Sequence, residues 1–407
     1  MNNKVNNNWK RIFYTISAGQ AFSLLGSSMV QFAIIWWLTV KTNSAVVLSA
    51  ASIAGFLPHA ILGPFIGALV DRHSRKAVMI AADLTIAAAT SVLIMFFFIG
   101  EPSVWVIYLI LTVRSLGSAF HMPAMQASIP MIVPEERLTS ASGVTQLIQS
   151  ASYALGPALA ALMLGVFSIE YVMMIDILGA VIATITLLVV SIPNPKKSIE
   201  DSENIGMLKE VLHGVKTLRG YKGLFILTVI SSIYMIIYIP VGSLFPLMVR
   251  GHFQGGAFEA SAVEVAFALG MFLGSIVLGA IGDKLKKDFI ISISILLMGV
   301  ALVISGCLPS SGFITFVILS AIMGLSAPLF SGAYMALLQS KVDPSVLGRV
   351  MGVVNSMMLF ATPLGLLIAG PGAEKLGIAR WFLISGIMIA ILAVICKLNP
   401  SIKTIED

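Results

Sequence analysis

The 407-residue sequence has little charge, since Asp, Glu, Lys and Arg make up only 11% of it while 58% of its residues are hydrophobic. A soluble domain carries about 25% charged residues, and a soluble chain of this length could not cover its surface with so few. This scarcity excludes a soluble globular protein and indicates a polytopic membrane protein. The only two cysteines, Cys307 and Cys396, lie inside apolar runs, so we expect neither a disulfide framework nor a thiolate metal site.

Sequence signatures of other chemistry are also absent. No stretch fits Gly-x4-Gly-Lys-Ser/Thr, which excludes an ATP-driven pump within this one chain. There is no His-Glu-x-x-His and no Gly-x-Ser-x-Gly, and none of the five histidines pairs with another at ligand spacing. An intramembrane enzyme, a metal site and a bound cofactor are therefore not expected. The net charge of +6 sits in loops between apolar runs, so it does not indicate nucleic-acid binding.

Long apolar runs fill most of the chain. A membrane-spanning helix needs about 20 mostly apolar residues, and the first run is too long for the core of a signal peptide, so we expect it to be retained. The runs predict an all-α integral membrane protein with twelve transmembrane helices. They cover residues 12–40, 44–69, 77–99, 104–132, 138–166, 171–192, 222–249, 258–281, 289–308, 312–340, 346–370 and 378–398.

The positions of the basic residues predict how the chain is oriented. If the N-terminus is cytoplasmic, 20 of the 25 Lys and Arg residues fall on the inner side and four on the outer side, with Arg114 inside a span. Inner loops are enriched in Lys and Arg. We therefore expect a multi-pass protein of a bacterial cytoplasmic membrane with both termini in the cytoplasm.

A short loop with an acid followed by bases occurs twice. Gly67-Ala-Leu-Val-Asp71-Arg72-His73-Ser74-Arg75-Lys76 has a weaker copy that begins at Gly279 and includes Asp283, which lies 212 positions after Asp71. Two such loops at matching places predict a duplicated protein with two pseudo-symmetric six-helix bundles. The expected domains are residues 1–192, a cytoplasmic linker over 193–221 with an amphipathic helix, and residues 222–407.

Several ionisable residues lie inside the apolar runs, where a charge costs about 2.5–3.5 kcal/mol or more. Arg114 stands near the middle of the fourth run and His121 follows on the same helical face. Asp176 and Glu264 stand two turns from the outer ends, and Asp83 stands two turns from an inner end, where it would brace the basic loop. For Arg114 and Asp176 two interpretations stay open, a proton-coupling group and a structural hydrogen-bonding group. For Glu264 the alternative to proton coupling is a carboxylate that faces a water-filled outer vestibule.

Polar side chains also recur at helical spacing inside the runs. Such stripes suit the wall of a wide amphipathic cavity for a substrate, and they suit interhelical hydrogen bonding equally well. The predicted cavity residues are Gln20, Ser27, Gln31, His121, Gln146, Gln149, Tyr153, Tyr234, Tyr238 and Asn355.

The loop Gly67-x-Leu-x-Asp71-Arg72-x-Ser74-Arg75-Lys76 resembles the signature between spans two and three of the major facilitator superfamily. The resemblance implies two six-helix bundles and a gating role for Gly67, Asp71, Arg72 and Arg75, with Asp283 as the weaker counterpart. Arg114 matches the arginine of that family's fourth-span motif, which implies proton coupling. Gly156-Pro157 resembles the antiporter motif of the fifth span.

A closer resemblance, over nearly the whole chain, is to the macrolide-efflux members of the drug:proton antiporters. It implies export of hydrophobic drugs, macrolides first, driven by inward proton flow across the lipid bilayer, and a ribosome-protecting ATPase as a partner. It rests on Asn8-Trp9-Lys10-Arg11, Ala18-Gly19-Gln20, Gly55-Phe56-Leu57-Pro58, Val70-Asp71-Arg72-His73, Ala119-Phe120-His121, Val133-Pro134-Glu135-Glu136, Leu347-Gly348-Arg349-Val350 and Trp381-Phe382-Leu383-Ile384-Ser385-Gly386.

The sequence therefore predicts proton-coupled drug efflux by alternating access, with no cofactor other than the proton gradient. An exporter of another amphipathic compound, a solute importer and a lipid scramblase on the same fold remain as alternatives. An importer of polar solutes would need more charge and hydrogen-bonding capacity than these stripes offer.

Overall fold

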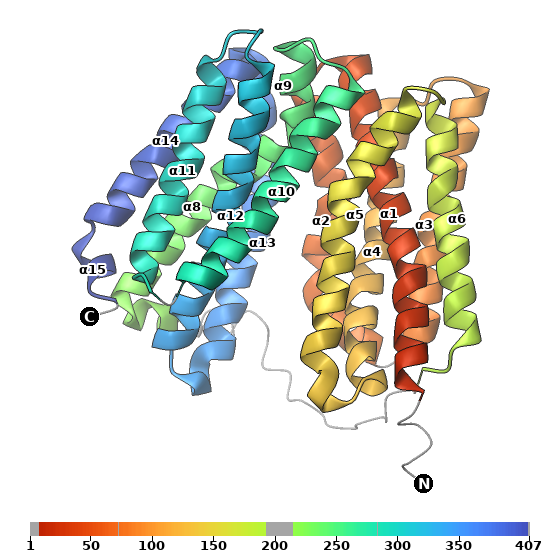
Figure 1. Ribbon diagram of the computed structural model, residues 1–407, viewed down its shortest axis with the longest axis horizontal. Helices are drawn as coiled ribbons and strands as arrows, with labels where there is room; N and C mark the ends of the chain where they lie inside the picture. Colours follow the sequence, from red (N-terminus) through yellow and green to blue (C-terminus); the bar gives the residue numbers. More distant parts are fainter. Residues whose placement is uncertain (1–7, 72, 193–214, 283, 406–407) are drawn as a thin grey trace. The chain divides into compact units, whose positions relative to one another are not determined.

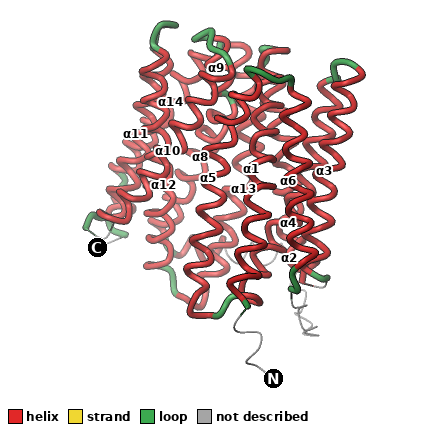
Figure 2. The backbone as a smooth tube through the Cα atoms, turned by 45° about the vertical axis from the view of Figure 1, so that its right-hand side comes forward, coloured by secondary structure: helices red, strands yellow, loops and turns green. Residues whose placement is uncertain are grey.

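The computed structural model describes residues 8–71, 73–192, 215–282 and 284–405, and within these ranges it contains helices and loops but no strand (Figures 1 and 2). Twelve helices are long and apolar enough to cross a membrane. The helices are α1 (Trp9–Thr42), α2 (Ala45–Asp71), α3 (Arg75–Ile99), α4 (Val104–Ile132), α5 (Leu138–Leu164), α6 (Ile169–Val189), α8 (Lys222–Ser243), α9 (Phe245–Gly251), α10 (Ala257–Ile281), α11 (Lys287–Cys307), α12 (Phe313–Lys341), α13 (Pro344–Leu376), α14 (Ile378–Leu398) and α15 (Pro400–Lys403), with a 3-10 turn at Glu135–Arg137.

The chain divides into two compact units, which correspond to its two halves except at one loop. The first comprises Met1–Lys41 and Ala50–Ile199, and the second comprises Thr42–Ser49 and Glu200–Asp407. In the first unit α3 packs against α4 and α6, and in the second α11 packs against α12 and α14. The third span thus meets the fourth and sixth, and the ninth meets the tenth and twelfth, as expected of a duplicated bundle.

Within the first unit, α1 and α6 approach closely enough to bring their backbones into contact. A methyl group at Gly26 would lie 2.9 Å from Asp176 Cα, and one at Gly179 would lie 2.7 Å from the carbonyl oxygen of Phe22. Small residues at helix contacts allow this approach where lipid provides no hydrophobic driving force. The contact carries Asp176 towards the side chains of α1.

The predicted seventh span, 222–249, is wrong as one helix. It is broken at Leu244, between α8 and α9. Pro246 occupies the first turn of α9. Because proline lacks an N–H and its fixed φ suits the first turn, it is favoured at the start of a helix.

The predicted end of the eleventh span at residue 370 is also wrong. Helix α13 continues through Pro371 to Leu376, and it ends where Gly377 adopts a left-handed φ of +85°. Glycine at this position terminates a helix at little steric cost. The apolar run stops earlier than the helix because the last turns carry Glu374 and Lys375.

The expected linker helix falls mostly outside the described residues, which omit 193–214. Residues 215–220 are helical, and Leu218 is only 1% exposed. The amphipathic helix over the whole of 193–221 stays a prediction.

Candidate functional site

A buried ion pair links α4 and α6 in the first unit. The Arg114 guanidinium pairs with Asp176 Oδ2, and the two side chains are 8% and 1% exposed. Arg114 also donates to the Thr90 hydroxyl of α3. Buried charges persist where they are paired and hydrogen-bonded. Arg114 and Asp176 meet this condition because each is the other's counter-charge.

Two hydroxyl groups complete the surroundings of Asp176. Ser27 of α1 donates to Oδ1 at 2.7 Å, and the Thr90 hydroxyl lies 2.7 Å from Oδ2. One carboxylate therefore joins four helices. We call this set, Ser27, Thr90, Arg114 and Asp176, the arginine layer.

A second polar layer contains the other buried acid of this unit. Asp83 of α3 accepts from Gln20 Nε2 of α1 at 3.4 Å, and its Oδ1 lies 3.5 Å from His121 Nε2 of α4. All three side chains are buried. We call Gln20, Asp83 and His121 the histidine layer. Asp83, expected to brace the basic loop, thus lies between Gln20 and His121, and its gating role stays a prediction.

The two layers stand about two helical turns apart on three helices. Each member of the histidine layer is separated by seven residues from a member of the arginine layer on the same helix, and seven residues correspond to a rise of about 10.5 Å. The pairs are Gln20 with Ser27, Asp83 with Thr90, and His121 with Arg114. Two carboxylates, one arginine and one histidine are therefore stacked along the interior of one bundle.

A small cavity borders the histidine layer. Its volume is about 20 Å³, and its lining includes Gln20, His121, Thr145 and Gln149. The amide of Gln149 lies 3.7 Å from the sulfur of Met122. Three of the predicted cavity residues thus meet at one place. The space suffices for about one water molecule and is far below the roughly 300–1,000 Å³ of pockets for drug-sized ligands.

Two of the other predicted cavity residues lie in an aromatic stack in the second unit. The rings of Tyr234 and Tyr238 on α8 stack with centroids 5.5 Å apart, and Phe330 of α12 packs on the other side of Tyr234 at 4.7 Å. Tyr234 is fully buried. The structure therefore places Tyr234 in packed interior, while its role towards a substrate stays a prediction.

The remaining predicted site residues are not brought together. Gln31, Gln146, Tyr153 and Asn355 are exposed, and Glu264 of α10 is half-buried. Among the residues that the structure describes, Glu264 has no hydrogen-bond or charge partner. A carboxylate without a partner stays a candidate for proton binding.

Two side chains of the basic loop, Arg75 and Lys76, donate to backbone carbonyls of neighbouring segments. Arg75 donates to the carbonyl oxygen of Ala127 on α4, and the Lys76 ammonium donates to the carbonyls of Leu188 and Val190 at 3.1 and 2.8 Å. Cations are favourable at helix C-termini. Gly67 and Asp71 lie in the last turns of α2, and Arg72 and Asp283 are outside the described residues, so the gating roles stay predictions.

The Gly156-Pro157 step lies inside α5 where it touches α1. A methyl group at Gly156 would lie 2.2 Å from the hydroxyl of Ser28 and 3.2 Å from the backbone nitrogen of Met29. Pro157 is accommodated within the helix. The glycine is therefore required for close packing, and the antiporter role implied by resemblance is a separate prediction.

Sequence analysis missed Glu374, which caps a helix. Its carboxylate accepts from the backbone nitrogen of Ala45 at 2.7 Å and from the hydroxyl of Ser44 at 3.0 Å. A carboxylate at a helix N-terminus satisfies free N–H groups and complements the helix dipole. The sequence gives half of this signal, a serine before α2, but not the partner 330 positions later.

Thr90 was also missed as a partner of Arg114, although its spacing of seven residues from Asp83 repeats that of Arg114 and His121.

Over the part of the chain that the structure describes, no three His, Cys, Asp or Glu side chains gather into a group that could hold a metal ion. Cys307 is exposed and Cys396 is buried, and both are free thiols.

Comparisons with known proteins agree with this architecture. The sequence matches the Major Facilitator Superfamily over residues 16–260 and 224–404. It is 46% identical to macrolide efflux protein A of Streptococcus pyogenes over 400 residues, 98% of each chain. It is 47% identical to macrolide efflux protein A of Enterococcus faecalis over 324 residues, 80% of this chain and 100% of that one.

Solved structures share the fold at low sequence identity. The nucleoside transporter NupG superposes with a TM-score of 0.74 at 13% identity, covering 95% of this chain and 98% of its own. The chain belongs to the major facilitator superfamily, in the subfamily that contains macrolide efflux protein A.

Proposed function

We propose that this protein exports hydrophobic drugs, macrolide antibiotics first, across a bacterial cytoplasmic membrane in exchange for protons. The substrate class rests on the 46% identity to macrolide efflux protein A over nearly the full length of both chains. The proton coupling rests on the buried pair of Arg114 and Asp176. We also propose that the basic loops and both termini lie on the cytoplasmic side of the membrane.

A buried arginine–aspartate pair suits proton coupling because one proton changes its electrostatics completely. When Asp176 is ionised it attracts Arg114, and when it is protonated that attraction disappears. Ser27 and Thr90 donate to the ionised carboxylate, so its protonation also changes their hydrogen bonding. A ligand or proton that interacts differently with two conformations shifts their populations.

In the proposed cycle, a proton from outside binds Asp176, releases Arg114 and favours the inward-open conformation. Drug binding from the cytoplasm or inner leaflet then favours loss of that proton, and the bundles rock back to the outward-open conformation. Asp83 of the histidine layer and Glu264 of α10 are the alternative proton acceptors. The proposal also includes the gating roles of the basic loop and the ATPase partner, both implied by resemblance.

The first test is accumulation of erythromycin in a susceptible, pump-deficient bacterium that expresses the chain, with and without a protonophore. We expect lower accumulation that the protonophore restores. Arg114→Ala should insert in the membrane and fail to lower accumulation. Unchanged accumulation with the wild-type protein present in the membrane would contradict the substrate, and export by Arg114→Ala driven by a proton gradient in vesicles would contradict the coupling.

A further inference from the structure

A groove opens between α1 and α6 at the end of the first unit that carries the N-terminus. Further along α1, away from its N-terminal end, the two helices are in contact, since a methyl group at Gly19 would lie only 2.1 Å from the Thr186 hydroxyl. Between that contact and the N-terminal end of α1, the side chains of Thr15, Ala18 and Thr186 line an open space of about 560 Å³. The closed end of the groove is therefore fixed by a glycine–threonine contact.

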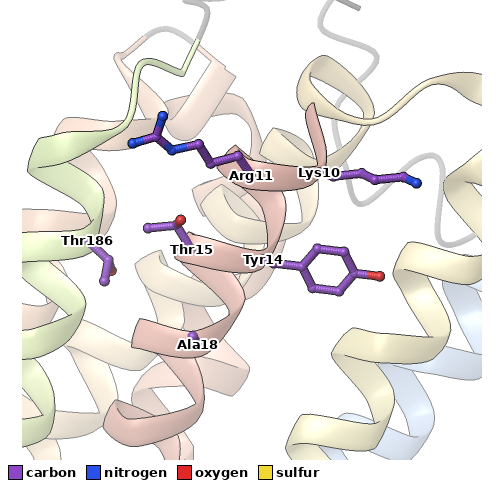
Figure 3. A pocket seen from close by; sticks show the side chains of 6 residues that line it. All are labelled: Lys10, Arg11, Tyr14, Thr15, Ala18 and Thr186. Carbon is purple, nitrogen blue, oxygen red and sulfur yellow. The ribbon is translucent and has the colours of Figure 1, made fainter. Parts of the chain in front are cut away.

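Figure 3 shows how the side chains are arranged around this groove. Arg11 and Thr15 extend from α1 towards the side where Thr186 projects from α6, and Lys10 and Tyr14 extend from the opposite side of α1. Tyr14 is 53% exposed. Two cations thus stand at the open end, with hydroxyl groups and a small apolar residue further in.

Basic residues gather at this end of α1 and α6. The first turn of α1 contains no acid. Carbonyl oxygens at the end of α6 would repel an anion. The Lys76 ammonium donates to two of them, those of Leu188 and Val190. The Lys10 ammonium lies over the face of Trp9, 5.8 Å from the ring centroid. An anion in this groove would meet two cations, Lys10 and Arg11, and no acid among the residues that line it.

We propose that this groove is a binding site for one anionic glycerophospholipid. Arg11 binds the phosphate, with the Thr15 hydroxyl within reach of it, and Lys10, which lines the same space from the other side of α1, supplies a second positive charge near the headgroup. An acyl chain lies along Ala18 and Thr186 up to the contact with Gly19. Basic pockets between membrane helices recognise anionic headgroups in this way, and the amphipathic ring of Tyr14 is of the kind that stays at headgroup level. A soluble phosphate would fill only the charged end.

The test is lipid binding to the purified full-length protein in a neutral detergent, followed by native mass spectrometry. The probes are phosphatidylglycerol, phosphatidylcholine with the same acyl chains, and glycerol 3-phosphate. Each basic residue near an anionic lipid contributes about five-fold in affinity, so the double variant Lys10→Gln/Arg11→Gln should weaken phosphatidylglycerol binding about 25-fold. Phosphatidylcholine and glycerol 3-phosphate should bind far more weakly than phosphatidylglycerol to the wild-type protein.

Lys397→Gln is the matched control. Lys397 also stands at an apolar groove, which is lined by Phe289 and Leu296 of α11, and it is the one base among the described residues that line this groove. Its ammonium lies over the Phe289 ring at 4.7 Å. We expect little change from this variant. An equal loss in Lys397→Gln and in the double variant would overturn the site and assign binding to general surface charge.

A groove-filling variant separates the site from an effect on folding. Ala18 is exposed, so Ala18→Phe should leave the fold and all charges intact while obstructing the acyl chain. We expect it to weaken phosphatidylglycerol binding, and Arg11→Lys should retain most of it. Unchanged binding by Ala18→Phe, or equal binding of glycerol 3-phosphate and phosphatidylglycerol, would refute a lipid site. None of these results depends on whether the protein exports a drug.

Discussion

Replacing Asp176 by asparagine removes the negative charge beside Arg114 while leaving a side chain of nearly the same shape. Asp176 is 1% exposed and Arg114 is 8% exposed, so the arginine charge stays buried without its counter-charge. Removing one partner of a buried pair costs about 3–5 kcal/mol. At about 2–4 °C per kcal/mol, the melting temperature of Asp176→Asn should fall by roughly 6–20 °C.

The double variant Arg114→Gln/Asp176→Asn buries no charge, and its two amides can hydrogen-bond to each other and to Ser27 and Thr90. Replacing both members of a buried pair is often nearly neutral. We therefore expect its melting temperature to return close to that of the wild-type protein. The coupling between the two substitutions should be about 2 kcal/mol or more.

Measuring drug export by these variants distinguishes a proton-coupling role of the pair from a purely structural one. Inside-out vesicles with an imposed pH gradient would report erythromycin uptake, and thermal unfolding in detergent would report stability. If the pair carries the proton, the double variant regains stability but not gradient-driven uptake. A double variant that regains both would refute the reasoning and reduce the pair to a structural role.

Three further predictions concern packing and capping. Thr90→Val removes a hydroxyl bonded to the ion pair and should cost about 1.5–3 kcal/mol, whereas Ser91→Ala, whose hydroxyl bonds only within its own helix, should be near neutral in thermal unfolding; equal effects would contradict this. Gly179→Val should separate α1 from α6 and lower the yield of monodisperse protein in gel filtration, while Gly143→Ala, with nothing within 4 Å, should not; normal yield for Gly179→Val would count against the contact. Glu374→Ala should cost about 1 kcal/mol through the lost cap, and an unchanged melting temperature would exclude that contribution.

The class and the spans were predictable because the bilayer imposes a local rule. About 20 apolar residues mark a spanning helix whatever its neighbours are, and twelve such helices are present. The two wrong boundaries arose where hydropathy and backbone geometry differ. Pro246 starts a new helix inside an apolar run, and α13 continues as helix through Pro371 beyond the end of its run.

The sequence by itself determined that this is a twelve-span membrane protein and that Arg114 and Asp176 are buried charges, because an ionisable residue inside an apolar run is conspicuous without any contact information. It did not say which buried acid pairs with Arg114. The tertiary structure decided that Asp176, 62 positions away, pairs with Arg114, and that Asp83 belongs with His121. It also decided that Glu374 caps the start of α2. These pairings depend on which helix faces meet, and a hydropathy pattern that is nearly apolar all round each helix does not encode which faces those are.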